Sequence, residues 1–234
     1  PTPPFFRQLQ STELASTPFL RWTDFGPGMA GYSDEFFLHP TDPNTMFVSM
    51  DMGNSYYTHD NALSWTTTKD WDTNAENQRP TSIDFSRQDP NFGLATSDHG
   101  VLLVTHDRGS TFSVVNNSMV TNASASAWGT MQVGVITVDP KNDSNWFIGS
   151  GQYWRVKETH RSSVNLTGTQ VTNTDYGHIF VSNDRGTTWH TISIDPVLDV
   201  GKIFVDPVIS DVVYAVTNVG FLKSIDGGFT WAKT

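Results

Sequence analysis

The sequence contains no cysteine, and this absence removes several kinds of chemistry at once. Disulfides, thiolate nucleophiles, zinc–thiolate sites and iron–sulfur clusters all require cysteine. Seven histidines are present, but none forms a His-x-His or His-x-x-x-His pair, so a transition-metal site is not expected. We therefore expect no cofactor. Calcium is the one cation left open, because loop carboxylates and carbonyls can bind it without a fixed spacing.

Basic residues and long apolar runs are also scarce. The 234 residues include 14 Lys and Arg against 24 Asp and Glu, a formal net charge of -10. Nucleic acids and anionic membranes are bound through clustered basic side chains, so neither is an expected partner. No run approaches the ~18 apolar residues of a membrane span. The sequence also lacks a Gly-x-Ser-x-Gly elbow and a phosphate-binding glycine loop before a helix, which sets aside serine hydrolase and nucleotide chemistry.

The sequence does contain an internal repeat of eight residues. The pattern S/T-x-D-x-G-x-T-W/F occurs at residues 105–112, 182–189 and 224–231, and a degenerate copy at residues 58–65 has Ala62 in place of the glycine. This pattern is identified as the Asp-box repeat. In a hairpin turn its aspartate can accept backbone hydrogen bonds, its glycine can take a positive φ, and its aromatic residue can return to the core. We therefore expect a structural role for the four aspartates, Asp60, Asp107, Asp184 and Asp226.

Each box follows a second recurring element, a short apolar stretch that ends in Asp-Pro or a close equivalent. Alternating apolar runs lie between the two elements, and this period of two predicts strands. Each unit then reads strand, Asp-Pro turn, strand, turn, strand, box turn, strand. That order predicts an all-β fold, a β-propeller of four-stranded antiparallel blades with Asp-box turns and about four blades in this chain.

The spacing of the boxes predicts the division of the chain. We expect an N-terminal extension at residues 1–21, then blades at about residues 22–75, 76–120, 121–195 and 196–234. The box aspartates are 47, 77 and 42 residues apart, and the long interval predicts an insertion, which we place at residues 149–176. An open arc of four blades would leave apolar edges exposed, so we expect further blades or another chain to complete it. The alternative is a closed ring of four blades.

The N-terminal quarter carries a more specific pattern. A glycine-rich segment at residues 22–31 precedes His39-Pro40, and the motif Asp-x-Gly-x-x-Tyr follows at residues 51–56. This order resembles the opening of xyloglucanase-type glycoside hydrolases, which are built from two seven-bladed propellers facing each other across a cleft. The resemblance implies that Asp51 is one of two catalytic carboxylates and that the second belongs to a propeller absent from this chain. The alternative for Asp51 is a turn or strand-end aspartate facing the central channel.

Other acids and several aromatic residues lie near this motif or in expected loops. Asp34, Glu35, Asp70 and Asp72 could supply a carboxylate, although nothing in their spacing selects one. Flat aromatic faces stack on sugar rings, so we interpret Tyr56, Trp71, Trp128 and Trp154 as candidate substrate-binding residues. For each tryptophan, packing between blades is the alternative. Trp65, Trp146, Trp189 and Trp231 are predicted to be core.

These patterns lead to two functional hypotheses. The first is a secreted or cell-surface propeller that binds or hydrolyses β-glucan or xyloglucan-type polysaccharide as part of a larger protein. The second is a non-catalytic Asp-box propeller that binds protein or glycan, as in sortilin-like receptors and assembly factors. A sialidase would need three arginines on a carboxylate, a tyrosine nucleophile and a glutamate. No arginine of this sequence lies in a recognisable sialidase context.

Overall fold

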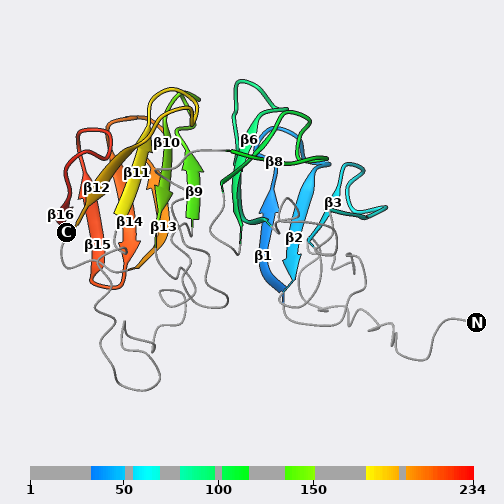
Figure 1. The fold of residues 1–234 in the computed structure, drawn as a ribbon, viewed down its shortest axis with the longest axis horizontal. Coiled ribbons are helices and arrows are strands. Elements are labelled where there is room, and N and C mark those ends of the chain that lie inside the picture. The colour runs from blue at the N-terminus through cyan, green and yellow to red at the C-terminus, as the bar shows by residue number, and fades with distance from the viewer. Residues whose placement is uncertain are drawn as a thin grey trace, which may run out of the picture.

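The computed structural model describes residues 33–50, 55–68, 80–97, 102–115, 135–150, 178–194 and 199–234. Within these ranges every regular element is a strand, and strands β1 to β16 form four antiparallel sheets of four (Figure 1). We call these sheets blades 1 to 4 in chain order. The predicted strand order within each unit is confirmed.

The strands are short. Blades 1 and 2 consist of β1 Ser33–Leu38, β2 Met46–Met50, β3 Tyr56–Thr58, β4 Thr66–Thr67, β5 Pro80–Phe85, β6 Gly93–Ser97, β7 Leu102–Thr105 and β8 Ser113–Val114. Blades 3 and 4 consist of β9 Val135–Val138, β10 Trp146–Gly149, β11 His178–Ser182, β12 His190–Ser193, β13 Val200–Val205, β14 Val213–Thr217, β15 Gly220–Ser224 and β16 Ala232–Lys233.

Each blade is a meander in which neighbouring strands in the chain pair with one another. The first strands β1, β5, β9 and β13 contact one another in that order, so they lie innermost and the fourth strands outermost. The outermost strands β4, β8 and β16 have only two residues each. Short edge strands offer little template for pairing with other chains.

Side chains from neighbouring blades form the core between them. One cluster joins Phe47 of blade 1 to Ile83 and Phe85 of blade 2. A second joins blades 2 and 3 around Trp146, which is fully buried, and a third joins blades 3 and 4 around Phe147. Because each fully buried large apolar side chain contributes about 1.5–3 kcal/mol, we infer that the blades stabilise one another through these contacts.

The two ends of the sheets differ in their connections. The four segments 58–65, 105–112, 182–189 and 224–231, called box turns below, all lie at one end, together with the turns that join the first and second strands of each blade. We call this the box end, and the opposite end the far end. The strand ends that flank each segment between the described ranges all lie at the far end.

Candidate functional site

The candidate catalytic residue lies outside the described residues, as do three of the four candidate sugar-binding residues. These are Asp51, Trp71, Trp128 and Trp154, and their roles stay predictions. Tyr56 is described. It is the first residue of β3, it is 9% exposed, and it packs with Val48 while Trp65 covers both.

The strand topology nevertheless relates these positions to one another. Strand β2 ends at Met50, immediately before Asp51, and β3 begins at Tyr56. Trp71, Trp128 and Trp154 belong to the segments between β4 and β5, between β8 and β9, and between β10 and β11. The described ends of all these strands lie at the far end of the blades.

Buried polar groups hold the described part of the far end together. The backbone N–H of His178 donates to Ser150 Oγ over 2.8 Å, and the N–H of Val200 donates to the Ser150 carbonyl over 3.0 Å. Ser150 is fully buried and thereby links blade 3 to blade 4. Asp199 and Asn218 bond each other through their backbone and the Asn218 side chain. These hydrogen bonds fix the described strand ends of blades 3 and 4 at the far end.

The aspartates of the box turns all make the same contacts. Asp226 Oδ1 accepts from Ser224 Oγ at 2.7 Å and from the N–H of Thr230 at 2.8 Å, and its Oδ2 accepts from Thr230 Oγ1 at 2.6 Å. Asp60, Asp107 and Asp184 repeat this arrangement in their own turns.

These contacts decide the charge of the box aspartates. Hydrogen bonds from Ser64 and Thr58 lower the pKa of Asp60 to about 2, and those from Thr230 and Ser224 lower the pKa of Asp226 to about 2. Burial alone would raise the pKa of Asp107 and of Asp184, but their hydroxyl and backbone donors outweigh it and lower both. A general acid must carry a proton at the working pH, so these four carboxylates are unsuited to that role.

The backbone of each box turn is left-handed at two successive residues. The positive φ predicted for the glycine occurs in Gly109, Gly186 and Gly228, at 84°, 82° and 91°. Ala62 takes the same conformation, at 65°. The residue before each of these four is also left-handed, a feature that the sequence hides because arginine and asparagine stand there in three of the turns.

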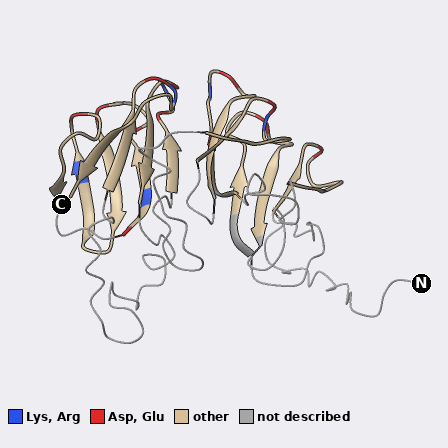
Figure 2. Cartoon of the chain, in the orientation of Figure 1, with Lys and Arg blue, Asp and Glu red and all other residues tan. Residues whose placement is uncertain are grey.

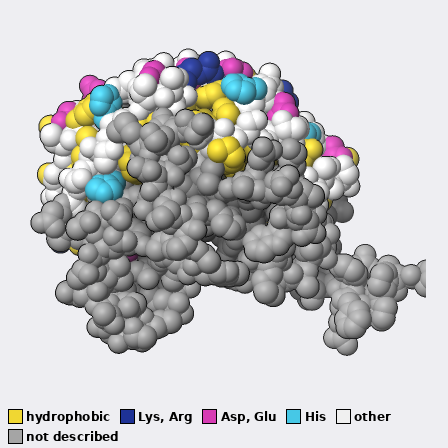
Figure 3. Space-filling model, viewed as in Figure 1, with side chains coloured by type: hydrophobic (Ala, Val, Ile, Leu, Met, Phe, Trp, Pro, Cys, Tyr) yellow, Lys and Arg dark blue, Asp and Glu magenta, His cyan; other side chains and the backbone are white. Residues whose placement is uncertain are grey.

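The box turns also join one blade to the next, and the arginines at their fourth position take part. Arg108 of blade 2 donates to Asp42 of blade 1 over 2.7 Å. Arg185 of blade 3 lies 3.1 Å from Asp89 of blade 2 and stacks over the ring of Phe92, with 4.2 Å to its centroid. Charged residues of both signs accordingly gather at the box end (Figure 2), interspersed with histidines on its surface (Figure 3). The recurrence of arginine at one box position was the sequence signal for these contacts.

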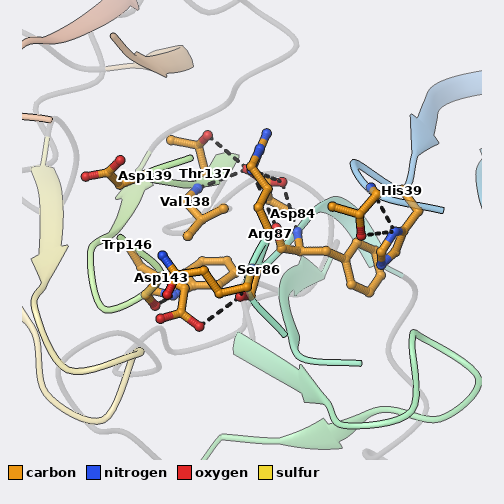
Figure 4. Close-up of polar contacts among 12 residues, drawn as sticks. His39, Asp84, Ser86, Arg87, Thr137, Val138, Asp139, Asp143 and Trp146 are labelled. Atoms are coloured by element: carbon orange, nitrogen blue, oxygen red, sulfur yellow. Dashed lines mark hydrogen bonds and ion pairs between the residues drawn. The ribbon is translucent and has the colours of Figure 1, made fainter. Parts of the chain in front are cut away.

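A buried carboxylate links blades 2 and 3 (Figure 4). Asp84 Oδ2 accepts from the N–H of Val138 at 2.9 Å and from Thr137 Oγ1 at 3.1 Å, and its Oδ1 accepts from the N–H of Phe85 at 2.9 Å. Burial raises the pKa of Asp84, although these hydrogen bonds and Arg87 oppose the rise. A raised carboxyl pKa is common in active sites, but the hydrogen bonds of Asp84 go to its own strand β5 and to strand β9 of blade 3, so we assign it a structural role.

His39 makes the corresponding link between blades 1 and 2. Its Nδ1 accepts from the N–H groups of Asp42 and Thr41, so its Nε2 carries the hydrogen that is donated to the carbonyl of Pro90 over 2.8 Å. Burial lowers the pKa of His39, which favours the neutral ring. The sequence marked His39 only as part of a His-Pro turn, and no sequence signal distinguished Asp84 from other strand residues.

The described ranges show neither a metal cluster nor a membrane-spanning helix. They contain no group of three or more His, Cys, Asp or Glu side chains placed to hold a metal ion. They also contain no helix that is long and apolar enough to cross a membrane.

Comparison with known proteins places the chain by its fold. No protein-family model and no curated protein matches the sequence. An ancestral GH74 enzyme superposes on 91% of this chain with a TM-score of 0.67 and 21% identity, and the match spans 25% of that enzyme. YCF48 bound to a D1 peptide matches 89% of this chain, and 54% of its own length, with a TM-score of 0.51 and 14% identity.

A GH74 xyloglucanase from Xanthomonas campestris is less similar, with a TM-score of 0.43 and 15% identity over 86% of this chain and 38% of its own. The chain thus spans a quarter to about half of the length of these proteins. At such identities the likeness concerns the fold alone. Together with the four antiparallel sheets, it identifies the chain as a set of β-propeller blades.

Proposed function

We propose that this chain is part of a secreted or cell-surface propeller that binds and hydrolyses β-glucan or xyloglucan-type polysaccharide. The likeness of 91% of the chain to an ancestral GH74 enzyme carries this proposal. The D-x-G-x-x-Y motif supports it, because Asp51 directly follows β2 at the end of the blades from which the long connections leave.

In this proposal Asp51 is one of two carboxylates that flank the scissile bond. An inverting glycosidase uses one carboxylic acid to protonate the leaving oxygen and a carboxylate to activate water, about 6.5–9.5 Å apart. The partner of Asp51 would come from a second propeller outside this chain. The engagement of the four box aspartates in their own turns supports the choice of Asp51, because it removes four other acids from consideration.

The test compares Asp51→Asn with the parent in the complete protein that contains this chain. Loss of one catalytic carboxylate should lower hydrolysis of xyloglucan and mixed-linkage glucan by about 10²–10⁴-fold while folding is unchanged. Asp206→Asn is the matched control, because Asp206 lies in a box-end turn and bonds the N–H groups of Val208 and Ile209. Undiminished hydrolysis by Asp51→Asn would remove Asp51 from the mechanism.

The candidate aromatic platforms can be tested by binding. Replacing Trp71, Trp128 or Trp154 with alanine should weaken binding of xyloglucan oligosaccharides by about 1–3 kcal/mol each if the indole stacks on a sugar ring. The control is Trp231→Phe, because Trp231 belongs to the core between blades 3 and 4. Unchanged affinity in all three alanine variants would favour packing roles for these residues.

A second candidate function is binding of a peptide without catalysis. The observation that favours it is the likeness of 89% of this chain to YCF48, which was solved with a D1 peptide bound. The two proposals predict different behaviour of the complete protein. Failure to bind or hydrolyse any β-glucan, together with measurable affinity for an extended peptide, would favour the binding module.

A further inference from the structure

At the box end a turn joins the first two strands of each blade, and the residue after the first strand caps this turn. Its side chain accepts hydrogen bonds from backbone N–H groups two or three residues farther along the chain. A hydroxyl or an ionised carboxylate remains an acceptor at mildly acidic pH, but an imidazole nitrogen accepts only while it carries no proton. The capping residues of blades 1 to 4 are His39, Ser86, Asp139 and Asp206.

Both ring nitrogens of His39 are engaged (Figure 4). Its Nδ1 accepts from the N–H of Asp42 at 3.1 Å and from that of Thr41 at 3.3 Å, and its Nε2 donates to the carbonyl of Pro90 in blade 2. A proton on Nδ1 would face two N–H donors. The Thr41 hydroxyl is 3.5 Å from Nδ1, outside the usual range of about 2.7–3.2 Å. The ring is 4% exposed and lies against Phe85, so a charged ring would also be poorly solvated.

The turn that His39 caps also carries an ion pair between the two blades. Asp42 Oδ2 accepts from Arg108 of blade 2 over 2.7 Å and from Thr45 Oγ1 of its own turn over 2.7 Å. The turn is therefore tied to blade 2 at two places, through the His39 ring to Pro90 and through Asp42 to Arg108. If the ring leaves its place, the first tie is lost and the residue that forms the second loses the acceptor of its N–H.

Groups from both blades set the affinity of His39 for a proton. Burial lowers its pKa from 6.5 most strongly, and Arg108 and His59 act in the same direction, whereas the Pro90 carbonyl and Asp42 oppose them. An exposed ring takes its proton near the ordinary pKa, but the buried ring does so only at lower pH. The stabilisation from the neutral ring is thus complete above pH 6.5 and is lost as the pH falls through the lowered pKa.

A second histidine beside this turn tolerates a proton. Burial lowers the pKa of His59 as well. Thr45 donates its hydroxyl hydrogen to Asp42, so Nδ1 of His59 donates to Thr45 Oγ1 over 2.8 Å. Its Nε2 lies 2.9 Å from the hydroxyl of Ser110, which can accept from a charged ring while it donates to the Asp107 carbonyl over 3.1 Å. Protonation of this ring removes no hydrogen bond.

We propose that His39 is an acid-sensitive latch between blades 1 and 2, whose protonation opens the turn at residues 39–45. The two N–H donors at Nδ1 carry this proposal, together with the bond from the same ring to blade 2. Serine and aspartate in the corresponding turns make blade 1 the one blade of the four with a cap of this kind. Blade 1 also supplies the strands on either side of the motif at residues 51–56, so the latch acts on the blade that carries the candidate carboxylate.

Hydrogen exchange of the full chain, measured by mass spectrometry at several pH values, tests the latch. Each rate is divided by the intrinsic rate at the same pH, which gives the protection of residues 39–45. This protection should fall by about tenfold between about pH 6.5 and 4.5, because proton uptake favours the open turn by up to about tenfold per pH unit. The turn at residues 206–212 is the internal control and should keep its protection, because the pKa of its cap Asp206 is lowered from 3.8 and the carboxylate stays ionised.

Two variants assign the effect to one histidine. His39→Asn retains an oxygen that can accept from the two N–H groups but cannot take up a proton, so the protection of residues 39–45 should no longer depend on pH in this range. His59→Gln is the matched control, because His59 lies beside the same turn, and the acid loss should remain. An acid loss that persists in His39→Asn, that disappears in His59→Gln, or that is equal in residues 206–212 would overturn the proposal.

Nitrogen NMR of the histidine rings in the parent chain gives a second measurement that does not depend on the folding of a variant. At neutral pH His39 should carry its hydrogen on Nε2, and its titration midpoint should lie below 6.5 and coincide with the loss of protection. A hydrogen on Nδ1, or a midpoint at or above 6.5, would overturn the latch. Neither experiment uses a polysaccharide or a peptide, so these results are independent of both proposed functions.

Discussion

Ala62→Gly should stabilise this protein, although it removes a methyl group. Ala62 holds a left-handed backbone, with φ of 65°, where the other three box turns have glycine. An L-residue in that conformation costs about 1–2 kcal/mol. Against this gain, glycine increases the conformational freedom of the unfolded chain, which lowers the free energy of unfolding by about 0.4–1 kcal/mol. The net expectation is a gain of about 0.5–1 kcal/mol in the free energy of unfolding.

The assay is equilibrium unfolding in urea, followed by circular dichroism and tryptophan fluorescence, with a thermal scan beside it. The transition midpoint should rise at unchanged m, and Tm should rise by about 1–4 °C for a chain of this size. A midpoint that is unchanged or lower, at the same m, would refute the argument that backbone strain is stored at Ala62.

Two opposite substitutions separate backbone strain from overlap. Gly227→Ala introduces a side chain at φ of 70°, but the nearest atom to its Cβ is Asp211 Oδ1 at 3.9 Å, so strain alone should cost about 1–2 kcal/mol. Gly109→Ala adds an overlap with Phe47, because a Cβ at this position would overlap the ring of Phe47 in blade 1, and its cost should reach about 2–5 kcal/mol. Equal losses in the two variants would show that the contact between blades does not require glycine.

Three further predictions concern the polar contacts. Arg185→Ala should cost about 1 kcal/mol in urea unfolding, through its half-exposed ion pairs and ring contact, whereas Asn183→Ala in the same turn should stay within about 0.5 kcal/mol. The pKa of Asp226 is lowered from 3.8 to about 2. Its ionised carboxylate therefore stabilises the fold above pH 3.8, and this stabilisation is lost as the pH falls toward 2. Asp226→Asn should remove that part of the acid dependence in unfolding curves measured from pH 5 to 2. Asp84→Ala should cost about 1–3 kcal/mol by leaving buried N–H groups without an acceptor, and Asp84→Asn should cost less. Only the parent should lose stability as the pH rises from 3.8 through the raised pKa of Asp84.

The box turns were predictable because their interactions are local. Asp184 bonds Ser182 and Thr188, which are two and four residues away, so eight consecutive residues contain the whole arrangement. The strands were predictable for a similar reason, since alternation along one strand indicates which side chains can be buried. The left-handed residues Arg108 and Arg185 were missed, because arginine before the glycine carries no conformational signal.

The candidate site was predictable only as a set of positions. The motif at residues 51–56 predicts a carboxylate five residues before a tyrosine, and Asp51 and the three candidate tryptophans lie outside the described residues. Tyr56 illustrates the limit of the motif. Its alternation in β3 is compatible with either face, and the structure buries its side chain beside Val48.

The amino-acid sequence by itself determined the repeat, the turn chemistry and the four-stranded unit, because each depends on residues close together in the chain. Only the tertiary structure decided which units meet and through which atoms. Asp84 reaches Val138 across 54 residues, and Gly109 lies on Phe47. Such pairs depend on how whole sheets are placed against one another, which no short stretch of the sequence specifies.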